Sequence, residues 1–312
     1  MVSAPHITDY FKQEAAKLDK VSDKVDEVNL QKLKVLAVSD DVDFDEASKF
    51  DEEKDKNIFR QYEEACDKVK SFYAEQHQKQ TYEYNVNIRK EFRNTVRARM
   101  SVWDAMEMLD NLVDESDPDT SVGQIEHLLQ TAEAIRRDGK PEWMQVTGLI
   151  HDLGKLLCFF GAEGQWDVVG DTFVVGCKFS DKIIYPDTFE ANPDYNKPQL
   201  STEYGVYEPH CGLDNVLLSW GHDEYMYEIC KNQSTLPREA LAMIRYHSFY
   251  PWHREGAYKH LMNEDDEVQL KAVKAFNPYD LYSKSDDPPQ KALLKPYYCS
   301  LIAKFFPEEI QW

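Results

Sequence analysis

Residues 141–161 read PEWMQVTGLIHDLGKLLCFFG, and they decide the class of the fold. Apolar residues occupy nearly every side of a helical wheel over this stretch, so we expect a helix at the centre of the protein. His151 and Asp152 interrupt the stretch side by side. Because an unpaired carboxylate on a buried helix is costly, Asp152 requires a cation, a metal ion or a strong hydrogen-bond donor.

Helical spacing of apolar residues recurs on both sides of this stretch. It is found in residues 59–77, 100–114, 121–140, 213–230, 236–250 and 267–282. Residues 166–179 alternate around glycines, which predicts a small hairpin or an ordered loop. Residues 187–205 contain two prolines and many polar side chains, which predicts a long irregular connection. The fold class that we predict is mainly α: a single helical bundle with a small β-hairpin element.

Charge and composition exclude several kinds of partner. Lys and Arg number 36 against 57 Asp and Glu, which leaves a formal net charge of -21. Such a surface repels phosphate backbones and anionic membranes, so we expect no nucleic-acid and no membrane partner. The six cysteines lie far apart without a C-x-x-C pair, and the N-terminus lacks the pattern of a signal peptide. We therefore expect a cytoplasmic protein, and a monomer.

The chain divides into two unequal parts. Residues 1–55 are acidic, contain no glycine and have few large apolar residues, so we expect a flexible N-terminal extension. The apolar periodicity begins just after it, and residues 56–312 are expected to form the helical domain that carries the function. Because the extension has too little apolar surface to support a core, its deletion is expected to leave that function largely intact.

Ionisable side chains interrupt several of the apolar helices. Taken singly, any one of them is explained as a buried residue with a hydrogen-bond partner or as a helix cap. Together they form a set of four histidines and two aspartates: His127, His151, Asp152, His222, His247 and Asp280. Six ligands are too many for one open metal ion and suit two ions bridged by a carboxylate. Nitrogen and oxygen ligands without thiolate favour iron or manganese over structural zinc.

His127 requires a further condition. On an ideal wheel it points away from the apolar stripe of its helix, which contains Ile125, Leu128, Leu129 and Ala132. It can therefore be a ligand only if the helix is buried on both sides; otherwise it is a surface residue. We expect burial.

Six strings of residues, in order along the chain, resemble the myo-inositol oxygenase family of the HD-domain superfamily. They are LVDESDPD, LIHDLGK, QWDVVGDTF, PHCGLDNVLLSWGHDEY, IRYHSFYPWH and FNPYDLYSK. The resemblance covers about residues 58–312 and implies an HD-domain-like helical bundle. It also implies a ring-cleaving oxidoreductase that converts myo-inositol and O2 to D-glucuronate in a four-electron reaction.

The resemblance assigns the cofactor and its ligands. It implies two iron ions in a mixed-valent Fe(II)/Fe(III) state. His127, His151 and Asp280 would hold one iron, His222 and His247 the other, and Asp152 would bridge them. Lys155 would be catalytic, because its charge can stabilise a metal-bound alkoxide; the alternative is a lysine that extends to solvent at a helix end.

The resemblance also implies a set of substrate contacts. They are Arg60, Asp114, Lys155, Gly170, Asp171, His247, Ser248 and Lys284. Gly170 would let the backbone approach the ring closely. Arg60 is the least secure, since Gln61 departs from the family string, and a surface salt bridge is the alternative.

Two other functions compete with this one. An HD-type metal-dependent phosphohydrolase would need basic groups for phosphate charge, which Lys155 and Lys284 could supply. The additional pair His222 and His247 and the acidic balance argue against it. A helical interaction module with an acidic tail would explain residues 1–55 but not the ligand-type residues within apolar helices.

Overall fold

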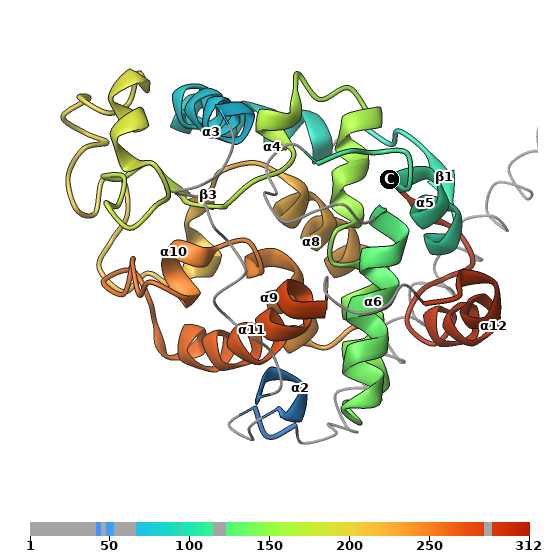
Figure 1. The fold of residues 1–312 in the computed structure, drawn as a ribbon. Helices are drawn as coiled ribbons and strands as arrows, with labels where there is room; N and C mark the ends of the chain where they lie inside the picture. Colours follow the sequence, from blue (N-terminus) through green and yellow to red (C-terminus); the bar gives the residue numbers. More distant parts are fainter. Residues whose placement is uncertain (1–41, 45–47, 53–66, 94, 115–122, 284–288) are drawn as a thin grey trace, which may run out of the picture.

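The computed structural model describes residues 42–44, 48–52, 67–93, 95–114, 123–283 and 289–312. Helices dominate, and the strands are short antiparallel pairs, which confirms the predicted mainly α fold (Figure 1). Within this described part, no helix has both the length and the apolar composition needed to cross a bilayer.

Helices α6 (Gln124–Arg137) and α7 (Glu142–Ile150) form the central pair. Every residue of α7 from Trp143 to Ile150 is buried, in agreement with the predicted central position. The single helix expected over residues 141–161 is wrong beyond Ile150, where a turn leads into the 3-10 helix η2 (Leu153–Phe159). A Cβ at Gly154 would lie 1.9 Å from the carbonyl oxygen of His222, so η2 lies closer to that segment than any other residue type would permit.

Three further helices complete the core beside this pair. They are α8 (His222–Gln233), α9 (Arg238–Tyr246) and α11 (Glu264–Tyr282), which lie side by side in Figure 1. The helix expected over residues 213–230 begins only at His222, so this histidine is the first residue of α8. Helix α11 continues through Pro278 and contains Asp280, in agreement with the helical spacing of residues 267–282.

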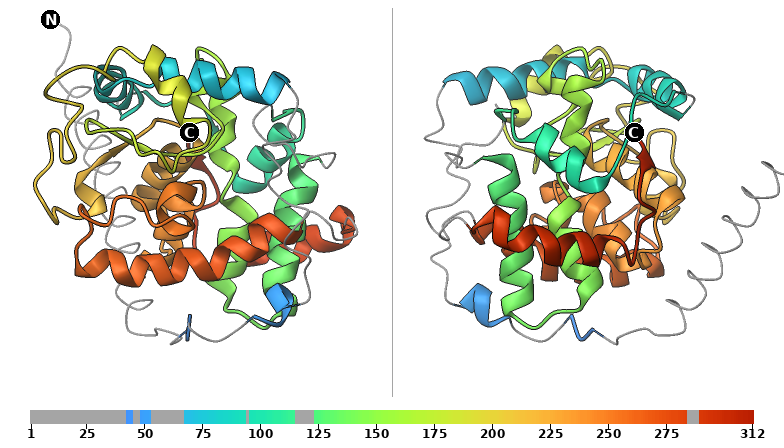
Figure 2. Two further views of the ribbon diagram at one scale, coloured as in Figure 1. Left: turned by 60° about the vertical axis from the view of Figure 1, so that its left-hand side comes forward. Right: turned by 90° about the vertical axis from the view of Figure 1, so that its right-hand side faces the viewer.

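Shorter elements surround the core. The helices are α2 (Lys49–Glu52), α3 (Asp67–Lys79), α4 (Tyr82–Arg93), α5 (Val102–Leu109), α10 (Tyr250–His253) and α12 (Lys291–Ile302), with 3-10 helices η3 (Gln165–Asp167), η4 (Pro186–Ala191) and η5 (Leu213–Asn215). Figure 2 shows α3 and α4 at one end of the molecule and α2 at the other. Ser101 caps α5 by accepting a hydrogen bond from the backbone N–H of Asp104.

The strands join distant segments. Strand β1 (Arg99–Met100) pairs with β4 (Ile310–Gln311). Strand β2 (Val174–Val175) pairs with β3 (Leu217–Leu218). Of the two alternatives predicted for residues 166–179, the structure therefore has the ordered loop and not the local hairpin, because the partner of β2 lies beyond the irregular segment.

Part of the acidic N-terminal segment contacts the core. The ring of Phe50 in α2 stacks on Tyr279 of α11, with ring centroids 5.3 Å apart. Ser48 Oγ donates a hydrogen bond to Asp138 Oδ2 at the end of α6, at 2.8 Å. The prediction for residues 1–55 otherwise falls mostly outside the described residues. These two contacts tie α2 to the helices that carry His127 and Asp280.

A pair of truncations tests the contribution of α2. A chain that lacks residues 1–52 should unfold at a lower urea concentration than a chain that lacks residues 1–41. The expected difference in the free energy of unfolding is about 1–3 kcal/mol, because the longer deletion removes an aromatic pair and a hydrogen bond to a carboxylate. Far-UV circular dichroism measures both transitions. Phe50→Ala in the full chain should reproduce part of the loss, and identical midpoints for the two truncations would show that α2 adds no stability.

Candidate metal centre

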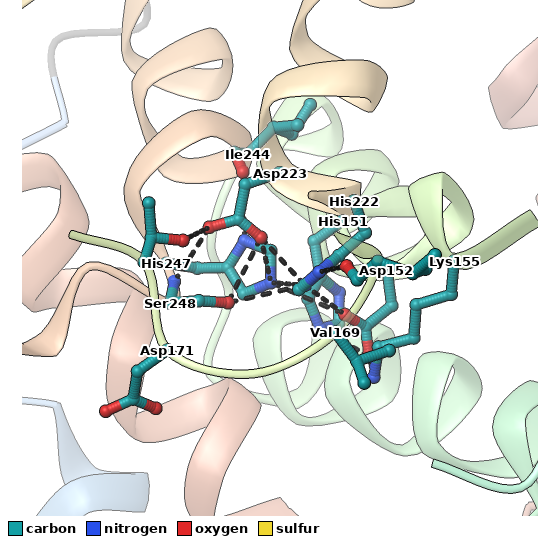
Figure 3. Close-up of polar contacts among 12 residues, drawn as sticks. His151, Asp152, Lys155, Val169, Asp171, His222, Asp223, Ile244, His247 and Ser248 are labelled. Atoms are coloured by element: carbon teal, nitrogen blue, oxygen red, sulfur yellow. Dashed lines mark hydrogen bonds and ion pairs between the residues drawn. The ribbon is translucent and has the colours of Figure 1, made fainter. Parts of the chain in front are cut away.

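Asp152 lies between two pairs of histidines. Its Oδ2 is 3.7 Å from Nε2 of His127 and 3.7 Å from Nε2 of His151. Its Oδ1 is 3.3 Å from Nε2 of His222 and 3.4 Å from Nε2 of His247. All five side chains are buried, and several of them appear in Figure 3. Each oxygen of this one carboxylate therefore faces a separate pair of imidazoles.

The first pair of histidines has a second carboxylate beside it. Asp280 Oδ1 lies 3.2 Å from Nε2 of both His127 and His151. On the other side the two Nε2 atoms of His222 and His247 are 3.2 Å apart. Ligands about 2.1 Å from one ion and at right angles to each other stand about 3 Å apart, so each group has the spacing of a coordination sphere. The structure thus brings together all six ligands that the sequence predicts, in two adjacent groups.

Hydrogen bonds to backbone carbonyls orient three of the imidazole rings. His151 and His247 directly follow the last residues of α7 and α9, and each Nδ1 lies within hydrogen-bond distance of the carbonyl three residues earlier (2.8 Å to Gly148 O and 2.9 Å to Ile244 O). His222 Nδ1 is 2.7 Å from the carbonyl oxygen of Val168. A carbonyl can only accept, so Nδ1 carries a proton; whenever the ring is neutral, as a metal ligand must be, its lone pair is on Nε2, which faces Asp152.

His127 reaches the site from the first turn of α6. Its side chain is only 5% exposed, and the neighbouring positions of α6 are buried on nearly all sides. This confirms the expectation of burial on both faces: α6 packs against α7 and also against α5 and α11. His127 can therefore face Asp280 of α11, 3.2 Å away, although it lies off the apolar stripe, which is buried as well.

The electrostatics of the site favour bound positive charge. Burial alone would raise the pKa of Asp152, but Lys155 and the neighbouring histidines outweigh it and hold that pKa well below its usual range. Burial similarly opposes ionisation of Asp280, yet His151 and His127 lower its pKa strongly. Burial disfavours the charged form of His222, but Asp223 and Asp152 raise its pKa to about 10. These carboxylates need cations beside them, and imidazole nitrogens with carboxylate oxygens are ligands that iron accepts.

Lys155 is fixed between two carboxylates. Its Nζ lies 2.8 Å from Asp152 Oδ2 and 2.8 Å from Asp114 Oδ2. The residue is 8% exposed, so it does not extend to solvent as a lysine at a helix end would. Burial alone would lower the pKa of Lys155, but the two aspartates raise it well above its usual range, and the side chain is an ammonium. A positive charge is therefore held directly against the central carboxylate.

Ser248 and Asp171 flank the second histidine pair at different distances. Ser248 Oγ is 3.3 Å from His222 Nε2, on the edge of the metal site. Asp171 accepts a hydrogen bond from the Tyr73 hydroxyl at 3.3 Å, and Figure 3 shows its carboxylate turned away from the histidines. Both predicted substrate contacts are buried near the site, and only Ser248 adjoins a metal ligand.

Gly170 is constrained by helix packing. Its φ is +94°, and a Cβ there would lie 2.7 Å from a ring carbon of Phe72 and 2.9 Å from Gln76 Nε2, both in α3. Glycine is therefore required at this position by the packing of α3 and by the left-handed backbone. Arg60 and Lys284, the other two predicted contacts, lie outside the described residues.

One acidic residue at this site was not predicted. Asp223 Oδ1 is 2.7 Å from Nε2 of His222 and 3.4 Å from Nε2 of His247. With those two histidines it forms a group that could hold a metal ion. The sequence carried a signal for it, because the His-Asp pair at 151–152 recurs at 222–223.

Comparisons with known proteins agree with this geometry. The family model described as myo-inositol oxygenase matches residues 66–312. The inositol oxygenase of Dictyostelium discoideum is 48% identical over 270 residues, which cover 84% of this chain and 92% of that protein. Inositol oxygenase 2 of Arabidopsis thaliana is 53% identical over 262 residues, covering 81% and 83%. The inositol oxygenase of Danio rerio is 49% identical over 265 residues, covering 83% and 95%. The predicted family is thereby confirmed, and this chain belongs to the myo-inositol oxygenase family.

Proposed function

We propose that this protein is an inositol oxygenase that cleaves the ring of myo-inositol with O2 to give D-glucuronate. The observation that supports this most strongly is the central carboxylate of Asp152, which faces one histidine pair with each oxygen. Two metal positions side by side suit a reaction in which a diol and O2 must meet. The alternative phosphohydrolase is less well supported, because the ammonium of Lys155 is already paired with two aspartates and is not free to bind phosphate.

The proposed cofactor is a pair of iron ions, Fe(II)/Fe(III) in the active form. One ion would be held by His127, His151 and Asp280, and the other by His222 and His247. Asp152 would be a ligand of both ions. When bound, the ions supply adjacent Lewis-acidic and redox-active centres for the substrate hydroxyls and O2. The residues fit this cofactor because their nitrogen and oxygen donors converge at ligand spacing.

The protein itself would bind and orient the polyol. Lys155 is proposed to donate a hydrogen bond to a substrate hydroxyl that has lost its proton, with Asp114 holding the ammonium in place. Ser248 would be a hydrogen-bond partner for a neighbouring hydroxyl. Burial of all these groups strengthens their electrostatic interactions with the substrate. Arg60, Gly170, Asp171 and Lys284 are proposed as further contacts with the polyol.

Residues 56–312 are proposed to act alone as a cytoplasmic, monomeric catalytic domain, with residues 1–55 as an extension.

Aerobic turnover tests the proposed function. The purified protein, loaded with iron, should consume one O2 per myo-inositol and release D-glucuronate, and it should do neither without O2. An oxygen electrode and chromatography of the product measure this. Nucleotides and a generic phosphodiester serve as the alternative substrates. Hydrolysis of these, together with no oxygen consumption with inositol, would favour the phosphohydrolase instead.

Asp152→Ala tests the bridge. The unaltered protein should contain close to two irons per chain, and the variant should lose both, because one carboxylate serves each ion. Elemental analysis after iron loading gives the content. The exposed Asp187→Ala is the matched control and should keep full iron. A variant at position 152 with full iron content would show that Asp152 does not bridge.

Lys155→Ala tests the role of the buried ammonium. With iron in excess the variant should keep its metal but lose roughly tenfold or more in kcat/KM, because a hydrogen bond to a charged group is worth about 1.5–3 kcal/mol. Lys155→Arg should rescue poorly, since a wide planar group replaces a compact one between Asp114 and Asp152. Oxygen consumption and iron content are measured together, with the exposed Lys304→Ala as control. Normal kcat/KM in Lys155→Ala at full iron loading would remove Lys155 from the mechanism.

A further inference from the structure

Asp223 holds together three segments that are far apart in the sequence. Its Oδ2 accepts hydrogen bonds from Thr172 Oγ1 at 3.1 Å and from the backbone N–H of Ser248 at 3.2 Å. Its Oδ1 accepts one from Ser248 Oγ at 3.1 Å. The carboxylate is 2% exposed and lies at the start of α8, while Ser248 follows α9 and Thr172 precedes β2. Figure 3 shows the contacts between Asp223 and Ser248 directly beside the histidines.

Backbone hydrogen bonds continue this connection. Thr172 N–H donates to the carbonyl of Ser248 at 2.9 Å, and His222 N–H donates to the carbonyl of Val168 at 2.8 Å. The segment from Val168 to Thr172 is therefore attached both to the start of α8 and to the residue after His247. Because hydrogen bonds to a charged carboxylate are roughly twice as strong as neutral ones, Asp223 is the strongest single link among these segments.

The position of this carboxylate bears on the proposed substrate. Ser248 Oγ donates to Asp223 and lies 3.3 Å from His222 Nε2, so Asp223 determines where that hydroxyl sits beside the second histidine pair. The same carboxylate holds Thr172, the neighbour of Asp171. Groups from two separate segments, both proposed to contact the polyol, thus take their positions from one side chain.

We propose that Asp223 is a positioning residue, which aligns Ser248 and the 170–172 segment beside the His222–His247 pair and so determines how a cyclic polyol is oriented there. The inference rests on the proposed function and extends it to a residue outside the predicted site. A direct bond from Asp223 Oδ1 to the second metal is the competing role. Oδ1 also lies 2.7 Å from His222 Nε2, but the three hydrogen bonds from Thr172 and Ser248 occupy both oxygens and favour positioning.

A double-mutant cycle of Asp223→Asn and Ser248→Ala tests the inference in the iron-loaded full chain. Asp223→Asn should keep both irons and raise KM for myo-inositol about tenfold or more, with a smaller change in kcat. Its preference for myo-inositol over the epimer scyllo-inositol, measured as a ratio of kcat/KM, should fall. Within the Ser248→Ala background the same substitution should raise KM less than about threefold, because the two residues act together. Anaerobic calorimetry of myo-inositol binding should show the same losses of affinity without turnover.

The outcomes separate the possible roles. Loss of one iron in Asp223→Asn would show that Asp223 is a metal ligand and would overturn the positioning role. An unchanged KM, or effects on KM that are fully additive with those of Ser248→Ala, would also overturn it. Thr172→Val removes the hydroxyl that donates to Asp223, at nearly constant side-chain volume, and should raise KM at least about twofold. If Asp223→Asn does not fold, this variant tests the positioning role in its place. The exposed Asp187→Asn should change nothing. Absence of inositol turnover in the unaltered protein would overturn the proposed function itself, a different result from turnover with an unaffected KM.

Discussion

The burial of the Asp152 carboxylate is the constraint on which the rest of the core depends. Moving such a charge out of water costs several kcal/mol unless compensating partners surround it. The partners here come from four helical segments and from Lys155, and each supplies a single group. The helices must therefore converge at one point. Because the four histidines come from four different helical segments, hydrophobic packing and the spacing of the predicted ligands cannot vary independently: a shift of α6 or α9 against α7 moves a nitrogen relative to the carboxylate.

Helix termination contributes directly to this geometry. The last carbonyls of a helix have no partner within the helix and need donors. His151 and His247 each place an Nδ1 donor on such a carbonyl at the ends of α7 and α9. The same hydrogen bond satisfies the backbone, fixes the tautomer and directs Nε2 to the centre. An asparagine could satisfy the carbonyl but would not supply an imidazole nitrogen at the required distance, so the structural and chemical requirements together select histidine at both positions.

The sequence predicted the ligand types better than it predicted the elements that carry them. Polar residues that interrupt apolar helices are visible in local spacing, which is why His151 and Asp280 were found. The end of α7 at Ile150 was not predicted. The segment that follows it packs against the carbonyl of His222 at Gly154, a contact with a distant part of the chain that local spacing does not contain. The pairing of β2 with β3 likewise depends on tertiary contacts that periodicity does not contain. Asp223 was missed for a related reason: its role comes from Thr172 and Ser248, which meet it only in the folded chain.

A buried ion pair behind the second histidine pair shows how the orientation of α8 and α9 is kept. Arg245 lies two residues before His247, and its guanidinium donates to both oxygens of Glu224, which lies two residues after His222, at 3.0 and 3.2 Å. Such a pair adds little net stability, since desolvation offsets much of its attraction, but removal of one partner leaves an unpaired buried charge. Any sliding of α8 along α9 would separate Arg245 from Glu224 and also His222 from His247. Misalignment of the two histidines therefore carries the cost of a broken buried ion pair, and this keeps both Nε2 atoms at ligand spacing.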